Sequence, residues 1–180
     1  RDEIVKEKPV KVMQTAMYIR TNEREKAIEL SHTVAEYFNK HGFQILREKI
    51  EACAEGIVGI PQTDSDIVGS NVYFEFHIKT KFEGKPIDSP ITNDEIQLLQ
   101  KISNRLTQSL RIPVPLSYNL NKNSDGENQR FLNVRFYGNG FESIKGKLIE
   151  VEKEIEFLGK EFGLTISKNI KECVWYDTLM

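Results

Sequence analysis

A chain of 180 residues falls within the usual size of a single domain and can bury a hydrophobic core without disulfides or metal ions. Its composition is 39% hydrophobic and 29% charged, as in an ordinary globular protein, and 27 acidic against 25 basic residues leave a net charge of -2. This balance argues against a nucleic-acid partner, since a nucleic-acid coat protein usually carries a basic excess.

Cysteine content and hydropathy indicate a cellular compartment. Cys53 and Cys173 are too few for a secreted disulfide framework, so we expect both to be buried, free thiols. No apolar run reaches the roughly 18 to 20 residues of a membrane span, and the N-terminal residues lack the apolar core of a signal peptide. We therefore expect a cytoplasmic protein without a membrane partner.

The first predicted unit follows a charged lead-in at residues 1–9. The mixed alternation of Val10–Arg20 predicts a strand. A helix is expected next, because Asn22 and Glu25 form a capping pair and apolar residues recur at helical spacing until Gly42. Phe43–Cys53 then reads as a second strand.

The second predicted unit begins after a long loop at residues 54–70, which is rich in glycine and in turn-forming residues. Val72–Phe82 alternates strictly and predicts a strand. Thr92 and Glu95 form a capping box that opens a second helix. Ile112–Leu120 alternates as a strand whose two prolines share one side, so this strand is expected at a sheet edge.

The third predicted unit follows a polar loop at residues 121–129 and starts with a strand at Arg130–Tyr137. The third helix shows the most regular spacing in the chain, with apolar residues at alternating steps of four and three up to Phe162. Gly163 ends it, and Leu164–Trp175 is a final strand.

The three units predict an α+β fold within one domain at residues 10–180. Residues 10–53, 72–120 and 130–175 each read as β-α-β, and the first and last units form a weak internal repeat. Two such units make a ferredoxin-like βαββαβ sandwich, which the third unit extends. We expect a mainly antiparallel sheet with helices on one face, since the strands alternate instead of forming continuous apolar runs.

One side of the strand Val72–Phe82 and the matching side of Arg130–Tyr137 carry polar groups. If the two strands are neighbours, these groups form one surface, the polar face. Its candidate ligand-binding residues are Tyr73, Glu75, His77, Lys79, Asn133, Arg135 and Tyr137.

These residue types suit binding of an anion. Lys79 and Arg135 would neutralise a phosphate or carboxylate, and Glu75 or His77 would accept a proton or hold a metal-bound substrate. The alternative is a solvated sheet face whose charges pair across strands. The three histidines match no metal-ligand spacing, and Asp64 and Asp66 read as turn residues, so we expect neither a metal site nor a cofactor.

The motif Glu75-x-His77-x-Lys79 resembles the ExExK signature of triphosphate tunnel enzymes, with His77 in the place of the second glutamate. The resemblance covers five residues of 180. In that family the strand-borne acids bind metal and the bases hold a polyphosphate, so the resemblance implies metal-dependent phosphate chemistry.

Three functions follow from these observations. The leading hypothesis is a binding or interaction module that uses the polar face for a small anionic ligand or a protein partner. The second is a metal-dependent phosphate-ester or polyphosphate hydrolase or transferase that uses Glu75, His77, Lys79 and Arg135. The third is a purely structural domain of a larger protein, because the chain begins without methionine. Whether the chain is an enzyme stays open, and a homodimer would bury Tyr73 and Tyr137 between subunits.

Overall fold

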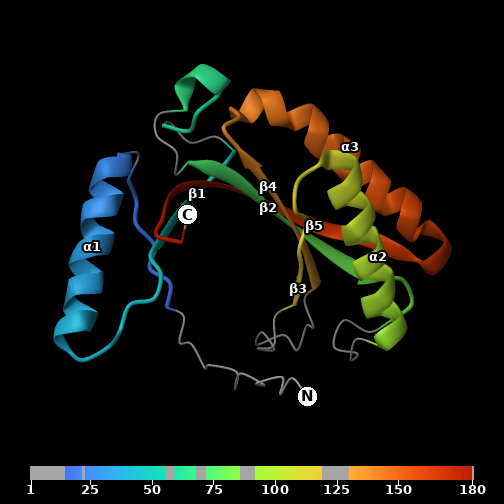
Figure 1. The fold of residues 1–180 in the computed structure, drawn as a ribbon, viewed down its shortest axis with the longest axis horizontal. Coiled ribbons are helices and arrows are strands. Elements are labelled where there is room, and N and C mark those ends of the chain that lie inside the picture. The colour runs from blue at the N-terminus through green and yellow to red at the C-terminus, as the bar shows by residue number, and fades with distance from the viewer. Residues whose placement is uncertain are drawn as a thin grey trace, which may run out of the picture.

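The chain folds as an α+β protein on an antiparallel sheet (Figure 1). The computed structural model describes residues 15–21, 23–55, 59–67, 72–85, 92–118 and 130–179. The α-helices within these ranges are α1 (Arg24–Lys40), α2 (Asn93–Leu110) and α3 (Phe141–Gly159). The strands are β1 (Lys49–Cys53), β2 (Tyr73–Phe82), β3 (Leu116–Tyr118), β4 (Arg130–Tyr137) and β5 (Leu164–Asp177).

The strand order of the sheet is β1-β5-β2-β4-β3, and every neighbouring pair is antiparallel. The α+β class and the antiparallel sheet expected from the alternation are therefore confirmed. Because β5 lies between β1 and β2, the last strand of the chain separates the first two. The centre of the sheet is β2, which pairs along its length with both β4 and β5.

The apolar side of β2 forms the middle of the hydrophobic core. Phe74, Phe76 and Ile78 are completely buried, as period-two alternation predicts for one face of a strand. Full burial of each such side chain stabilises the fold by about 1.5–3 kcal/mol. The helices α2 and α3 cover this side of the sheet and lie next to each other in Figure 1.

Local signals in the sequence set the start of α2. Thr92 accepts a hydrogen bond from the Glu95 backbone N–H at 3.3 Å, and Glu95 accepts one from the Thr92 N–H at 2.7 Å. The predicted capping box is confirmed. The buried residues of α2 and α3 follow the expected helical spacing, and among them are Leu99, Ile102, Leu106, Ile144, Leu148, Val151 and Ile155.

The first helix lies apart from the other two, beside the β1 edge of the sheet (Figure 1). Its N-cap is Glu23 without a side-chain cap bond, and the predicted cap Asn22 lies outside the described residues. Arg24 Nε donates to the Trp175 carbonyl at 3.1 Å, and His32 Nδ1 lies 3.0 Å from Glu48 Oε2. None of the helices in the described ranges is long and apolar enough to cross a membrane.

Two predicted strands near the N-terminus differ from the structure. Residues 15–20 of the predicted strand Val10–Arg20 form neither helix nor strand, and residues 10–14 lie outside the described ranges. The predicted strand Phe43–Cys53 is regular only from Lys49 onward. The regular ladder begins where Lys49 meets Asp177, the last residue of β5, and a bond from the Thr178 N–H to the Glu48 carbonyl at 3.1 Å extends the contact by one residue.

The predicted strand Ile112–Leu120 is also shorter than expected. Its regular part is Leu116–Tyr118, and Leu120 lies outside the described residues. Pro113 and Pro115 lack the backbone N–H that a ladder needs, which limits the strand at its start. The expected position at a sheet edge is confirmed, since β3 pairs with β4 and is last in the strand order.

The loop before β2 holds the start of α3. Its short 3-10 helix, Asp64–Asp66, presents the Asp64 carboxylate to the Gly140 backbone N–H at 2.7 Å. The next N–H groups of α3 donate to the carbonyls of Pro61 and Gln62, both at 3.0 Å. These bonds satisfy N–H groups that a helix leaves unpaired at its start.

Alanine substitutions at two glycines, one at the contact between the loop and α3 and one inside α3, are expected to change the free energy of unfolding in opposite directions. A Cβ on Gly140 would lie 2.5 Å from the Thr63 Cα and carbonyl oxygen, so Gly140→Ala should lower the free energy of unfolding by about 1–3 kcal/mol. Gly146 lies inside α3 with open space around it, so Gly146→Ala should raise that free energy by about 0.5–1 kcal/mol. Urea unfolding followed by circular dichroism measures both, and equal signs would contradict the close contact between the loop and α3.

Candidate binding site on the polar face

The register of the sheet brings the predicted polar residues of β2 and β4 together on one face. Tyr73 is opposite Tyr137, Glu75 opposite Arg135, and His77 opposite Asn133. Paired residues of antiparallel strands point to the same side, so the six share the face that α2 and α3 leave uncovered. The condition for a shared polar surface, that these two strands are neighbours, is met, whereas the role of these residues in binding stays a prediction.

Glu75 is the central charge of the polar face, and its side chain is only 2% exposed. Arg135 Nε donates to Glu75 Oε1 at 2.7 Å, and Lys49 Nζ contacts Glu75 Oε2. Burial alone would raise the pKa of Glu75, but these two cations outweigh it and hold the pKa below its usual value. Glu75 is therefore a carboxylate fixed between two cations, which suits it to positioning Arg135 better than to proton transfer.

His77 is held through both of its ring nitrogens. Nδ1 lies 2.6 Å from Asn133 Oδ1, and Asn133 in turn donates through Nδ2 to Ser117 Oγ at 2.7 Å. Nε2 lies 3.0 Å from Glu172 Oε2. Burial alone would lower the pKa of His77, but the bonds to Glu172 and Asn133 and the negative charges nearby raise it overall.

A second buried group lies where β2 and β5 meet at the end of the face. The Tyr73 hydroxyl donates to Asp177 Oδ2 at 2.7 Å, and Arg47 Nε donates to Asp177 Oδ1 at 2.8 Å. Burial and the bond to Asp177 raise the pKa of Tyr73. The Tyr73 ring also packs on Tyr137 at 5.0 Å between centroids, so Tyr73 is buried within a single chain.

Two predicted residues are placed differently from the rest of the polar face. Lys79 pairs with Phe131 and Lys168, four residues along β2 from Glu75 and its partner Arg135. Four residues of a strand span about 13 Å, so Lys79 and Arg135 are not adjacent as an anion grip would require. The Tyr137 side chain is 48% exposed and lies at the rim of the face.

Several residues of the polar face were not predicted from the sequence. Lys49 and Glu51 come from β1, and Glu172 and Asp177 come from β5. Alternation does place Lys49 and Glu51 on one side of their strand. It does not show that β5 lies between β1 and β2, and this strand order is what brings them to His77 and Glu75.

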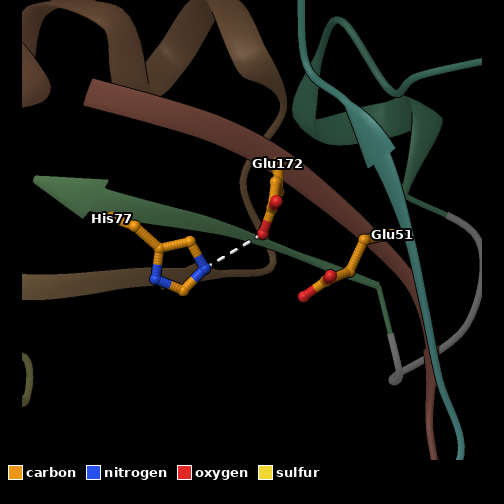
Figure 2. A group of neighbouring side chains, drawn as sticks. All are labelled: Glu51, His77 and Glu172. Carbon is orange, nitrogen blue, oxygen red and sulfur yellow. Dashed lines mark hydrogen bonds and ion pairs between the residues drawn. The ribbon is translucent and has the colours of Figure 1, made fainter. Parts of the chain in front are cut away.

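Glu51, His77 and Glu172 converge on one point of the face, each from a different strand (Figure 2). One ligand atom from each side chain lies within 4.8 Å of the other two. Lys49 Nζ contacts Oε1 of Glu51. Burial, opposed by Lys49, raises the pKa of Glu51, and the charges of Glu172 and Glu75 add to the rise.

The two cysteines differ in their environments. Cys173 is buried in the core, where burial raises its pKa to about 12, and the expectation of a buried thiol is confirmed for this residue. For Cys53 the expectation is wrong, because its thiol is exposed at the sheet edge. The reason is that Cys53 alternates with the buried Ala52, so its side chain points to the same side of β1 as Lys49 and Glu51.

Comparison with known proteins gives no family or function for this chain. No protein-family model, curated protein or solved structure matches it. The geometry of the polar face is therefore the guide to function.

Proposed function

We propose that this protein is a binding module whose polar face receives a small anionic ligand. The observation that carries the proposal is that the ionisable groups of this face are fixed in position on the side of the sheet opposite to α2 and α3. Glu75, His77 and Asn133 are held by side-chain hydrogen bonds and are buried or half-buried. Preorganised, partly desolvated charges of this kind are typical of binding sites, whereas a solvated face carries mobile side chains.

Arg135 is the best candidate for direct contact with the ligand. Its Nε donates a hydrogen bond to Glu75, and its side chain is 34% exposed. Its guanidinium carbon lies 5.8 Å from the centre of the Tyr73 ring. Hydrogen bonds from a guanidinium to a carboxylate or phosphate are directional and strong. A carboxylate or phosphate beside Tyr137 would therefore meet an oriented cation at the open rim.

The architecture supports the same proposal. The order of elements β2-α2-β3-β4-α3-β5 and the strand order β5-β2-β4-β3 correspond to a ferredoxin-like sandwich, to which α1 and β1 add at the β5 edge. We propose this assignment, and the internal repeat of residues 10–53 and 130–175 stays a prediction. In such an arrangement the open sheet face is available to a ligand or to a second copy of the chain.

Calorimetric titration with pyrophosphate, ATP and citrate tests the proposal. Arg135→Gln should weaken binding by about 10- to 100-fold, because a hydrogen bond to a charged group is worth about 1.5–3 kcal/mol. The control is Arg105→Gln, which removes an arginine that is ion-paired with Glu154 at 2.8 Å between α2 and α3. This variant should bind like the wild type. If none of the three anions binds, or if both variants bind equally weakly, the proposal is wrong and a structural domain becomes the better interpretation.

A metal-dependent phosphate-ester or polyphosphate hydrolase or transferase is a second candidate, and the convergence of Glu51, His77 and Glu172 favours it. The residues proposed from the sequence need revision for this case. Glu75 is ion-paired with Lys49 and Arg135, and Lys79 lies four residues farther along β2. His77 and Arg135 would therefore carry the chemistry. Release of phosphate from pyrophosphate or a nucleoside triphosphate with Mn²⁺ present distinguishes this enzyme from a binding module.

A further inference from the structure

Glu51, His77 and Glu172 have the spacing of metal ligands. Metal–nitrogen and metal–oxygen bonds of about 2.0–2.2 Å place neighbouring ligand atoms roughly 3.3 Å apart in a tetrahedral site. His77 Nε2 and Glu172 Oε2, at 3.0 Å, are already close to this separation. Because the three ligand atoms lie within 4.8 Å of one another, Glu51 needs to move by only about 1.5 Å. Its side chain is 36% exposed on an edge strand, which leaves room for that rotation.

The surroundings of His77 orient the nitrogen that would bind the metal. Asn133 Oδ1 accepts the proton of Nδ1, because Asn133 Nδ2 is committed to Ser117. The remaining nitrogen, Nε2, is directed at the carboxylates. A hydrogen-bond acceptor on the second nitrogen of a histidine is the usual support of a metal ligand, since it sets the tautomer and the ring orientation. The Phe131 ring, 6.3 Å away between centroids in a T-shaped arrangement, further restricts the imidazole.

We propose that Glu51, His77 and Glu172 bind a divalent transition-metal ion such as Zn²⁺. The ion would lie between the Nε2 atom of His77 and the carboxylates of Glu51 and Glu172. The imidazole favours Zn²⁺ and its neighbours in the first transition row over Mg²⁺ or Ca²⁺, which prefer oxygen ligands. Three protein ligands leave at least one coordination position for water or for an incoming ligand, as in catalytic and not in structural zinc sites.

The metal would also change the charge of the polar face. Without it, the cations Lys49 and Arg135 face the three carboxylates of Glu51, Glu75 and Glu172. With a divalent ion and neutral His77, the same set carries one net positive charge. The open coordination position and Arg135 would then both attract a carboxylate or phosphate. This last step rests on the proposed function, whereas metal binding itself does not.

Direct titration of the purified, chelator-treated protein with Zn²⁺ and Co²⁺ tests the site without any organic anion. We expect calorimetric binding of one Zn²⁺ per chain and visible absorption bands from bound Co²⁺. His77→Gln should weaken Zn²⁺ binding by at least about 100-fold, because even the loss of a supporting residue around a metal site costs about 10- to 100-fold. Glu51→Gln, on the exposed edge strand, should weaken it in the same direction while the circular dichroism spectrum stays unchanged.

His32→Gln is the matched control, since His32 also lies 3.0 Å from a glutamate but belongs to no comparable group of ligands among the described residues. It should bind Zn²⁺ like the wild type, and so should Cys53→Ser. The proposal is overturned if the wild type binds no Zn²⁺, if folded His77→Gln and Glu51→Gln proteins bind it as tightly as the wild type, or if Cys53→Ser abolishes binding. Zn²⁺ binding without affinity for pyrophosphate, ATP or citrate would support the metal site and contradict the anion-binding function alone.

Discussion

Replacing Glu75 by glutamine is expected to lower the free energy of unfolding by about 3 kcal/mol, because removing one partner of a buried ion pair leaves its partner charge uncompensated. Two cations bond to this carboxylate, Arg135 at 2.7 Å and Lys49 in direct contact, and Lys49 keeps a second partner in Glu51. Because glutamine keeps the shape of the side chain, the decrease in the free energy of unfolding measures the effect of removing the charge. Urea unfolding at neutral pH gives the value.

Glu142→Gln provides the comparison for this experiment. Glu142 and Lys145 form an ion pair at 2.6 Å on α3, with both side chains about half exposed. An exposed pair contributes only about 0–1 kcal/mol, since water screens its charges. If Glu75→Gln costs no more than Glu142→Gln, the ion-pair network of the polar face does not stabilise the fold.

A loss of about 3 kcal/mol is also expected for Asp177→Asn at neutral pH, because it breaks a second buried charge pair. The Asp177 side chain is 2% exposed and accepts bonds from Arg47 and from the Tyr73 hydroxyl. Asp94→Asn is the control, because Asp94 is an exposed residue of the first turn of α2. That variant should lose at most about 1 kcal/mol of helix-dipole interaction.

The Asp177 pair predicts a defined pH dependence. The hydrogen bond from Arg47, opposed by burial, holds the pKa of Asp177 well below its usual value, and the bond from Tyr73 adds to this. An aspartate in the unfolded chain titrates near about 3.9. Since the unfolded state takes up the proton first, the stabilisation is complete above about pH 5 and declines as the pH falls further.

Unfolding measured from pH 7 to pH 3 checks this sign. The free energy of unfolding of the wild type should fall more steeply toward low pH than that of Asp177→Asn. The difference between the two free energies should therefore become smaller as the pH falls. Glu75, whose pKa is also lowered, contributes with the same sign in both proteins. A constant difference across this range would show that Asp177 does not titrate as the ion pair requires.

Local sequence patterns predicted the elements whose ends are set by nearby residues. The capping box of Thr92 and Glu95 starts α2, and the alternation of Val72–Phe82 gives the two faces of β2. Strand ends were predicted less well. The strand β1 begins at Lys49, opposite Asp177 at the end of β5, and this boundary depends on pairing between distant segments and not on neighbouring residues.

The sequence by itself determined which side chains share a face, because period-two alternation is a property of a single strand. Tyr73, Glu75 and His77 could therefore be identified as one polar side. Only the tertiary structure decided their partners. The insertion of β5 between β1 and β2 brings Glu172 and Glu51 to His77 and Lys49 to Glu75. Strand order depends on how distant segments pack over a common core, and no local pattern specifies it.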